Sequence, residues 1–396
     1  MFPKLRFKEF DGDLTESKLV ELTSWASGGT PAKDVPEYWG DDIPLISGAS
    51  MHTNQLYESD VKITKLGLQK GSKLALKDSI LILVRGSMLF NKIPMGITLG
   101  DVAFNQDVKC IRPKQQLAPL FLFQWLHAKE NTIQNKVTAT GIGAGKLDTA
   151  DLQNLKLYKP SLEEQTKIAT FLSAVDEKIS QLTQKHQLLR EYKQGMMQKL
   201  FSQQVRFKAD DKSEFGEWEE KELKDIAEIN PKSKKLPESF IYIDLESVEK
   251  GQLLLQKNIE LQDAPSRAQR LLAKGDVLFQ MVRPYQQNNY YFNLSGEYVA
   301  STGYAQIRTK LDSKFIYYAL HEKTFLDEVM NRCTGTSYPA INSSDLSSIE
   351  ILIPCLEEQT KIANFLSSID QKIEVVAQQI EQAKQWKKGL LQQMFI

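Results

Sequence analysis

The stretch Pro160-Ser-Leu-Glu-Glu-Gln-Thr-Lys-Ile-Ala-Thr-Phe-Leu-Ser173 decides the fold, because it occurs twice in the chain. It returns 194 residues later as Pro354-Cys-Leu-Glu-Glu-Gln-Thr-Lys-Ile-Ala-Asn-Phe-Leu-Ser367. The offset holds without a gap to the C-terminus, and 20 of the 42 positions from 160 to 201 are identical to their partners. Solenoid repeats are only about 20 to 50 residues long. The chain is therefore a tandem duplication of a whole domain.

Each copy of this stretch opens a predicted long helix. A proline precedes it, and a Glu-Glu pair lies in the first turn, where acidic side chains complement the helix dipole. Apolar positions then recur at alternating spacings of four and three, which is typical of a coiled-coil seam. In the first copy the seam comprises Ile168, Leu172, Val175, Ile179, Leu182, His186, Leu189, Lys193, Met196 and Leu200. In the second it comprises Ile362, Leu366, Ile369, Ile373, Val376, Ile380, Ala383, Lys387, Leu390 and Met394.

The simplest partner for one such helix is the other, packed parallel or antiparallel within the chain. Two separate homodimers are the alternative. His186 lies on the seam where the second copy has Ile380. A polar seam residue usually sets helix register, and we favour that role for His186 over metal binding or catalysis.

The portions between the helices are predicted to be mixed α and β. Ile80–Val84 and Val277–Val282 are short apolar runs typical of buried strands, whereas 121–126 and 315–320 have a helical pattern. The expected fold class is thus α/β, with mixed α+β heads, two long helices forming an intramolecular coiled coil, and pseudo-symmetric duplication. We divide the chain into a head (1–150), a helix (151–203), a second head (204–345) and a second helix (346–396).

Composition is that of an ordinary globular protein. The 50 basic and 50 acidic side chains cancel, so any nucleic-acid surface must arise from a local separation of charge. The three cysteines are scattered, which argues against a disulfide framework or zinc site and favours a cytoplasmic location. No apolar run is long enough to span a membrane, and the first residues do not form a secretory signal.

The chemistry of catalysis is not visible in the sequence. It contains no P-loop, no His-Glu-x-x-His and no Cys-x-x-Cys pattern. The segment Gly141-Ile-Gly143-Ala-Gly145 follows a threonine-rich stretch rather than a strand, so we interpret it as a plain loop rather than a cofactor-binding turn. We expect no catalytic residue, no metal site and no cofactor bound by this chain.

Basic and amide-rich positions suggest where DNA would bind. Lysine and arginine contact phosphate, arginine can read guanine, and glutamine can read adenine. The candidate DNA-binding residues are Lys73 and Arg85 in the first head, and Arg283, Tyr285, Gln286 and Gln287 in the second. Taken alone, such clusters are usually just a solvated face.

Together these features resemble the specificity subunits of Type I restriction–modification enzymes. The matching motifs are Pro3-Lys-Leu-Arg-Phe7, Ser27-Gly-Gly-Thr-Pro31, Asp78 with Arg85-Gly86, Asn105-Gln106 and the doubled Leu-Glu-Glu-Gln-x-x-Ile-Ala-x-Phe-Leu-Ser. The doubled helix motif is the specific part. The second head departs from the pattern, because it lacks Ser-Gly-Gly-Thr-Pro and has Pro284 after Arg283. Head residues therefore carry over less safely than the helices.

The resemblance implies that each head is a target-recognition domain for one half of a split, asymmetric DNA sequence. The paired helices would set the gap between half-sites and dock two modification subunits, which bring S-adenosylmethionine and methylate adenine. Up to two restriction subunits, which use ATP and Mg²⁺, could join them. For the partner interface we name the exposed faces of the two helices, including Glu163, Glu164, Glu357 and Glu358, although simple dipole compensation would explain these four equally well.

Three other functions stay open at this stage. The chain could be the recognition subunit of a Type II enzyme that fuses cleavage and methylation, or a protein-interaction scaffold without DNA. It could also be an enzyme, such as a nuclease, with an unrecognised site. A repeated cluster of carboxylates with a lysine would favour the nuclease, and the sequence contains no such cluster in both halves.

Overall fold

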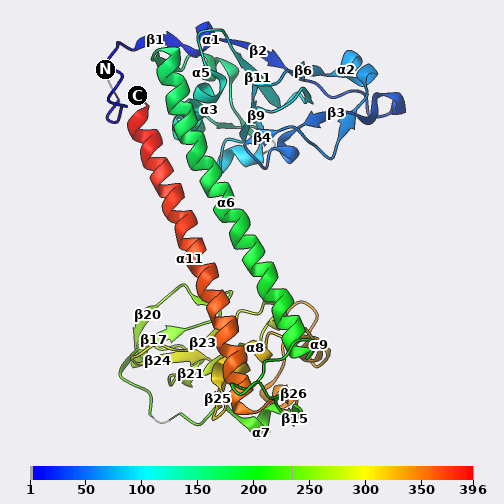
Figure 1. Ribbon diagram of the computed structural model, residues 1–396, viewed down its shortest axis with the longest axis vertical. Coiled ribbons are helices and arrows are strands. Elements are labelled where there is room, and N and C mark those ends of the chain that lie inside the picture. Colours follow the sequence, from blue (N-terminus) through cyan, green and yellow to red (C-terminus); the bar gives the residue numbers. More distant parts are fainter. Residues whose placement is uncertain (1–2, 142, 234, 396) are drawn as a thin grey trace. The chain divides into compact units, whose positions relative to one another are not determined.

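The computed structural model describes residues 3–141, 143–233 and 235–395. Contacts divide the chain into two units (Figure 1): unit 1 comprises 1–183 and 378–396, and unit 2 comprises 184–377. The division falls inside both long helices, α6 (Leu162–Phe201) and α11 (Leu356–Met394). Each unit therefore contains one head, the first half of the helix that follows it, and the second half of the other helix.

The head of unit 1 is built from four small sheets and short helices. In spatial order the sheets are β1 (Thr15–Lys18) with β14 (Lys156–Lys159); β5 (Lys62–Ile63), β3 (Trp39–Ile46), β10 (Val102–Phe104) and β6 (Lys73–Ala75); β2 (Thr23–Ser27), β11 (Val108–Pro113), β7 (Ile80–Leu83), β9 (Met95–Thr98) and β4 (Gln55–Leu56); and β12 (Thr138–Ala139), β13 (Gly145–Lys146) and β8 (Arg85–Gly86). Its helices are α1 (Leu19–Leu22), α2 (Lys65–Gly71), α3 (Pro119–Ala128), α4 (Glu130–Gln134) and α5 (Thr149–Gln153).

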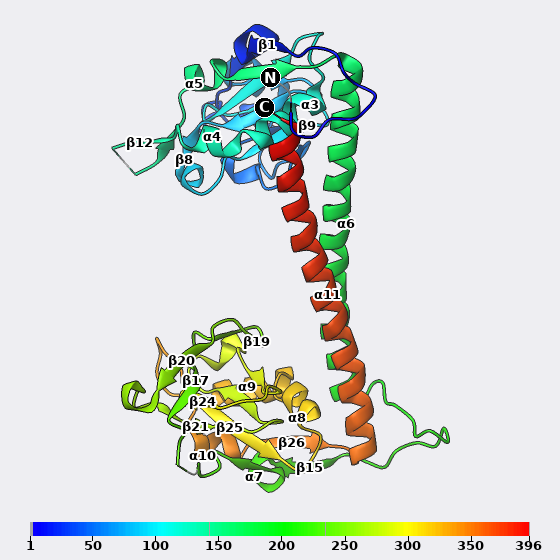
Figure 2. The same ribbon diagram turned by 90° about the vertical axis from the view of Figure 1, so that its left-hand side faces the viewer.

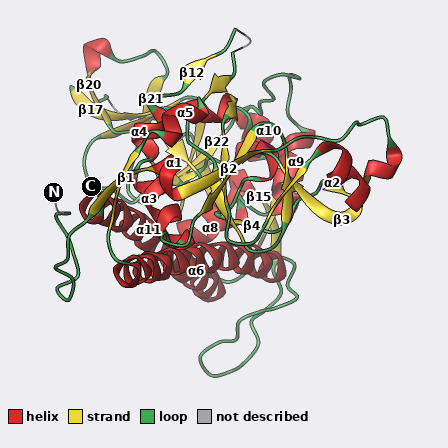
Figure 3. Ribbon diagram, turned by 90° about the horizontal axis from the view of Figure 1, so that it is seen from above, coloured by secondary structure: helices red, strands yellow, loops and turns green. Residues whose placement is uncertain are grey.

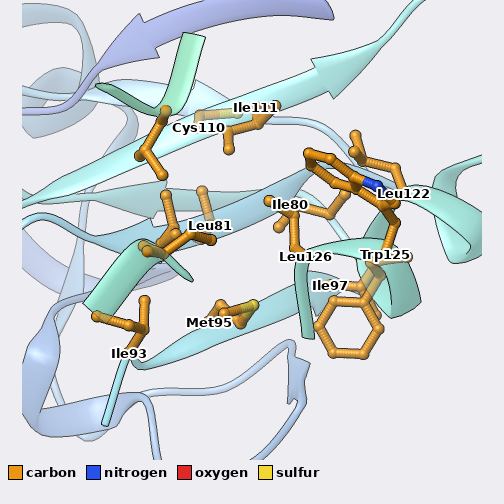
Figure 4. Close-up of a cluster of buried hydrophobic side chains, with 14 of the residues drawn as sticks. Ile80, Leu81, Ile93, Met95, Ile97, Cys110, Ile111, Leu122, Trp125 and Leu126 are labelled. Atoms are coloured by element: carbon orange, nitrogen blue, oxygen red, sulfur yellow. The ribbon is translucent and has the colours of Figure 1, made fainter. Parts of the chain in front are cut away.

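The core of this head lies between strand β7 and helix α3. All four β7 residues are buried, as expected for an aliphatic run in the middle of a sheet. Figure 4 shows Ile80 of β7 beside Trp125 and Leu126 of α3, whereas Leu81 lies farther from α3, on the side of Cys110 and Ile93. The predicted strand at 80–84 and helix at 121–126 are thus confirmed, with slightly different ends.

The head of unit 2 is also built from small sheets and short helices, but its strands are arranged differently within the sheets. In spatial order its sheets are β15 (Glu219–Glu222) with β26 (Glu350–Ile353); β16 (Ala227–Ile229), β25 (Tyr304–Thr309), β22 (Val277–Gln280) and β23 (Tyr290–Tyr291); β20 (Lys257–Glu260), β17 (Ser239–Ile243), β24 (Tyr298–Ser301) and β21 (Ala268–Leu271); and β18 (Val248–Glu249) with β19 (Gln252–Leu253). Its helices are α7 (Leu223–Ile226), α8 (Ser313–Ala319), α9 (Lys323–Asn331) and α10 (Ser343–Ser347). Strand β22 and helix α8 confirm the predicted strand at 277–282 and helix at 315–320.

Helices α6 and α11 are antiparallel where they lie together within each unit (Figures 1 and 2). Every strand of the described residues lies outside the two long helices, which Figure 3 colours as helix. The apolar seam predicted from the sequence is largely buried, including Leu172 in the first copy and Leu366 in the second. The intramolecular coiled coil is thereby confirmed, and its antiparallel direction resolves what the sequence left open.

Two lysines interrupt the seam for a specific reason. In unit 1, Lys387 of α11 donates to Asp176 Oδ1 of α6 at 2.5 Å, and Gln124 of α3 donates to the other oxygen at 2.8 Å. In unit 2, Lys193 donates to Asp370 Oδ1 at 2.6 Å, and the hydroxyl of Tyr318 donates to Oδ2 at 2.7 Å. Each seam lysine thus pairs with an aspartate that a head residue also binds.

The end of each long helix completes the core of the head that belongs to the other copy. In unit 1, Phe395 packs against Phe121 of α3 with ring centroids 5.4 Å apart, and Met394 is buried in the same cluster. In unit 2, Phe201 packs against Phe315 of α8 at 5.6 Å, with Leu200 buried beside it. Each copy of the duplicated sequence therefore supplies part of the hydrophobic core of the other copy's head.

The expected helical segments start later than 151 and 346. Residues 151–161 include the end of α5 and strand β14, which pairs with β1 of the head. Residues 346–355 include the end of α10 and strand β26, which pairs with β15. The long helices begin only at Leu162 and Leu356, after the two prolines that precede the duplicated motif.

Candidate nucleic-acid interface

In unit 1, the end of buried strand β7 presents Arg85 at the surface. The chain leaves β7 and forms the short strand β8, in which Arg85 pairs with Lys146 of β13. The Arg85 side chain is 59% exposed and lies 4.0 Å from Asp107 Oδ1. The arrangement therefore brings two cationic side chains, Arg85 and Lys146, onto adjacent strands.

The hairpin that carries Lys146 needs glycine at one position. A Cβ added to Gly145 would lie 2.9 Å from the Leu89 side chain and 3.0 Å from the Gly86 carbonyl oxygen. Gly145 thus permits β13 to approach β8 closely. Of the predicted plain loop at 141–145, Gly145 belongs to β13 and Gly143 and Ala144 precede that strand, whereas Ile142 lies outside the described residues.

Unit 2 has an equivalent arrangement around Arg283. The residue before it, Val282, forms an isolated bridge with Ala340, and the Arg283 N–H donates to the Pro339 carbonyl at 2.7 Å. The Arg283 guanidinium lies over the ring of Tyr338, 4.2 Å from its centroid. Tyr338 is 64% exposed, so the stacked pair stands at the surface and restricts how the guanidinium can turn.

The segment after Arg283 exposes two of the other three residues predicted for this head. It forms a 3₁₀ turn (Pro284–Gln286) in which Tyr285 is 51% exposed and Gln286 is exposed. Gln287 is half-buried and its side-chain amide donates to the His321 carbonyl at 3.5 Å. Arg283, Tyr285 and Gln286 are therefore neighbours on one surface loop, whereas Gln287 faces partly inward.

Lys73 lies elsewhere in its head. It is an exposed residue of β6, opposite Phe104 of β10, in a different sheet from the one that holds Arg85. The structure thus groups Arg85 with Lys146 and leaves Lys73 as a separate basic position.

The second glutamate of each duplicated motif is an internal ion-pair partner. Glu164 accepts two hydrogen bonds from Arg6, both 2.7 Å long, and its side chain is only 3% exposed. Glu358 accepts two from Arg206, at 3.1 and 2.7 Å, and its side chain is fully buried. These bonds raise the pKa of both arginines above their ordinary value.

This burial corrects one assumption behind the partner-interface prediction. We expected all four glutamates on the exposed helix faces, but only Glu163 and Glu357 are exposed. Glu164 and Glu358 are not on those exposed faces, because Arg6 and Arg206 pair with their buried carboxylates. The prediction of a partner interface therefore rests on Glu163 and Glu357.

The glutamine that follows each pair anchors a turn of the head. Gln165 accepts from the Ala118 N–H at 2.9 Å, just before α3, and donates to the Pro160 carbonyl at 2.9 Å. Gln359 accepts from the Asp312 N–H at 3.1 Å, just before α8, and donates to Pro354 at 2.8 Å. The Glu-Gln part of the motif therefore joins helix to head.

Sequence reasoning missed one duplicated element. Leu5-Arg6-Phe7-Lys8 corresponds to Val205-Arg206-Phe207-Lys208, at an offset of 200 rather than 194. Phe7 packs edge-on against Phe171 at 5.7 Å, and Phe207 packs against Phe365 at 5.6 Å. A search that allowed the offset to change would have found this repeat.

Within the described residues, no group of three or more His, Cys, Asp or Glu side chains could hold a metal ion. His186 is half-buried on the seam. Over the same part of the chain, no helix is long and apolar enough to cross a membrane.

Comparison with known proteins gives a consistent result. The family model of the Type I restriction modification DNA specificity domain matches residues 12–190 and 216–385. The MjaVIII specificity subunit of Methanocaldococcus jannaschii, a Type I restriction enzyme subunit, is 27% identical over 409 residues, covering 97% of this chain and 94% of that protein. The EcoR124I/EcoR124II specificity subunit of Escherichia coli is 29% identical over 182 residues, covering 46% of this chain and 45% of that protein.

Two solved structures share the fold. The crystal structure of the S subunit of a Type I restriction–modification system from M. genitalium has a TM-score of 0.62 and 17% identity, covering 100% of this chain and 99% of that one. A chain from a study of complex assembly and conformational transition of the type I R-M system has a TM-score of 0.56 and 17% identity, covering 97% of both chains. Since the family model matches each repeat separately, the chain belongs to the family of Type I restriction modification DNA specificity domains and contains the family's domain twice.

Proposed function

We propose that this chain is the DNA-reading subunit of a Type I restriction–modification complex, with each head reading one half of a bipartite, asymmetric target. The observation that carries the proposal is that the two heads share a backbone arrangement but differ in the side chains that it presents at the surface. In both heads an arginine follows the end of a buried strand. The neighbouring side chain differs, because Arg85 lies beside Lys146 and Arg283 lies over Tyr338. The same backbone arrangement with different side chains is what two different half-sites require.

The side chains at these surface positions suit recognition of double-stranded DNA. A guanidinium can donate two hydrogen bonds to O6 and N7 of guanine, and a carboxamide can pair with N6 and N7 of adenine. Arg85, Arg283 and Gln286 are the candidates for base contacts. Tyr285 can pack against the sugar-phosphate backbone, and Lys73 can contact a phosphate without reading sequence.

We further propose that the chain itself does no catalysis. Its described residues contain no cluster suited to a metal ion. In this proposal S-adenosylmethionine enters with the modification subunits, and ATP and Mg²⁺ enter with the restriction subunits. The complex acts in the cytoplasm, where the host DNA lies.

Matching residues of the long helices in the two units support docking of two identical modification subunits and up to two restriction subunits. In unit 1 a hollow of about 590 Å³ is lined by Phe7, Glu163, Thr166, Lys167, Thr170 and Phe171. Trp386 stands beside it, 53% exposed, with its ring 6.0 Å from that of Phe171. In unit 2 the corresponding positions include Glu357, Phe365 and Tyr192, which is 51% exposed.

The test is a map of methylated adenine in the source cell with the gene intact and deleted. Loss of one split motif, with two short half-sites around a fixed gap, supports the proposed function. Arg85→Ala and Arg283→Ala then serve as matched variants, because each should relax only one half-site, and not the same one. An unchanged map after deletion, with the partner subunits present, would refute the proposal.

A further inference from the structure

The loop Arg283 to Asn288 in unit 2 contains two residues in a strained backbone conformation. Arg283 and Gln287 both have left-handed backbone angles, with φ of 54° and 52°. Residues other than glycine adopt this conformation only when the surroundings stabilise it, because Cβ approaches the carbonyl oxygen. The loop therefore depends on whatever lies beneath it.

Beneath the loop lies the side chain of Gln280, the last residue of β22. It is 2% exposed. Its Nε2 donates to the Val282 carbonyl at 2.8 Å and to Gln286 Oε1 at 2.9 Å, and its Oε1 accepts from the Asn288 N–H at 3.1 Å. One buried carboxamide thus binds the residue just before the loop, a residue near its middle and its last residue.

A second buried amide holds Gln280 in place. The backbone N–H of Gln280 donates to Oδ1 of Asn289, which is 1% exposed, at 2.8 Å. The Asn289 Nδ2 lies 3.4 Å from the ring nitrogen Nε2 of His321, and the His321 Nδ1 lies 2.7 Å from the Tyr317 carbonyl. The loop is thus supported by a polar network that continues into the head.

The other head has no such support at the matching position. Counting back from Arg85 as from Arg283, the residue that corresponds to Gln280 is Ile82, which is fully buried in β7. An isoleucine side chain cannot form hydrogen bonds to a loop. The carboxamide is therefore a feature of the unit 2 head alone.

We propose that Gln280 is a positioning residue that sets the base specificity of the unit 2 head by fixing the orientation of the Gln286 carboxamide. The proposal rests on the proposed function. Because Gln280 directs an N–H toward Gln286, it holds the Gln286 oxygen as an acceptor and leaves the Gln286 Nε2 donors for DNA. The second lone pair of that oxygen also stays available. A freely rotating carboxamide can exchange donor and acceptor, whereas a fixed one presents them in one order to a base edge such as N7 and N6 of adenine.

The experiment uses the chain assembled with its modification subunits. The substrates are duplexes that carry the wild-type bipartite motif with each base pair of both half-sites replaced in turn. The variants are Gln280→Met, which keeps the side-chain length but removes the hydrogen bonds, Gln286→Ala, and the double variant. The matched control is Gln306→Met, because Gln306 is equally buried on the neighbouring strand β25 and binds Leu271 and Asp276 rather than the loop.

We expect Gln280→Met and Gln286→Ala to lower discrimination at the same single base pair by about 10-fold or more. The double variant should lose no more than the stronger single variant, because both changes remove one function. The Gln306→Met control should keep its discrimination. The near-isosteric Gln280→Glu variant replaces the shared donor with a carboxylate oxygen that faces both the Val282 carbonyl and Gln286. The Gln286 carboxamide can turn over to donate to this oxygen, which should change the preferred base at that position.

Several results would overturn the proposal. These are full discrimination in Gln280→Met, equal losses at both half-sites, the same loss in Gln306→Met, or no effect of Gln286→Ala. If Gln280→Met does not assemble, Gln286→Ala and Gln280→Glu decide the question by whether they alter the same base pair. Failure of the proposed function is distinguishable, since the wild-type complex would then methylate no split motif.

Discussion

Replacing Met394 with alanine should weaken the head of unit 1, although Met394 is the last residue of the second long helix. Met394 is 5% exposed and belongs to the same cluster as α3. Its counterpart in the first copy, Leu200, is 1% exposed and belongs to the cluster around α8 in unit 2. Met394→Ala and Leu200→Ala are therefore matched perturbations of opposite heads.

The expected size follows from the atoms removed. Each substitution deletes three buried heavy atoms, which at about 0.8 kcal/mol per buried methylene corresponds to about 2.4 kcal/mol. The cavity left behind raises this to about 2–4 kcal/mol. Where amide exchange requires opening of the unit, a loss of 2.4 kcal/mol accelerates exchange roughly 60-fold.

Hydrogen exchange followed by mass spectrometry separates the two heads in one measurement. Met394→Ala should accelerate exchange in peptides from α3 and leave peptides from α8 unchanged, and Leu200→Ala should do the reverse. Gln392→Ala, an exposed neighbour on the same helix, is the control and should change neither. Faster exchange in α8 after Met394→Ala, with α3 unaffected, would refute the conclusion that the end of each long helix packs into the core of the other copy's head.

Three further outcomes follow from individual contacts. Arg206→Ala leaves the buried carboxylate of Glu358 with fewer partners and should destabilise unit 2 by about 2–4 kcal/mol in the same exchange assay, whereas Lys208→Ala removes only an exposed pair and should have no measurable effect. Burial lowers the pKa of His321 to about 4, below the value of about 6.5 in an unfolded chain; the resulting stabilisation is present above pH about 6.5 and is lost as the pH falls toward 4. In urea unfolding, the free energy of unfolding should therefore change by about 2–3 kcal/mol less between pH 6.5 and 4 in His321→Asn than in wild type. The same pH dependence in both proteins would show that His321 is not its source. Lys73→Ala should weaken DNA binding equally for all sequences and reduce the salt dependence by about one phosphate contact, which binding titrations at several salt concentrations would measure; a change in base preference would argue against a phosphate contact.

The architecture followed from the sequence where the signal was periodic or repeated. The seam of four and three spacing identified both long helices, and the apolar run at Ile80 identified the central strand of the first head. These signals are local or repetitive, so a single sequence contains them in full. The direction in which the helices pair is not local, because a seam suits parallel and antiparallel partners alike.

The surface loops were harder to predict, because their important contacts join distant residues. Nothing near Glu164 indicates that Arg6, 158 positions earlier, will enclose it. A glutamine such as Gln280 within an apolar run looks like an imperfection of a strand until the loop above it is seen. Tyr338 lies in a segment that corresponds to the glycine-rich stretch at 141–145 of the first copy. Because that stretch has no aromatic residue, comparing the two copies gave no indication that Tyr338 stacks on Arg283.

The closure of each unit has a consequence for the order of the chain. The N–H of Leu5 donates to the Gln393 carbonyl at 2.9 Å, and the N–H of Val205 makes the equivalent bond with Lys199 at 3.1 Å. In the second case the two residues are joined by a short turn, and in the first they belong to opposite ends of the sequence. We expect a circular permutant that links Phe395 to Pro3 and begins instead after Ser202 to keep the contacts described for each unit. The same backbone hydrogen bond thus forms at both junctions, although a short turn joins its two segments in only one of them.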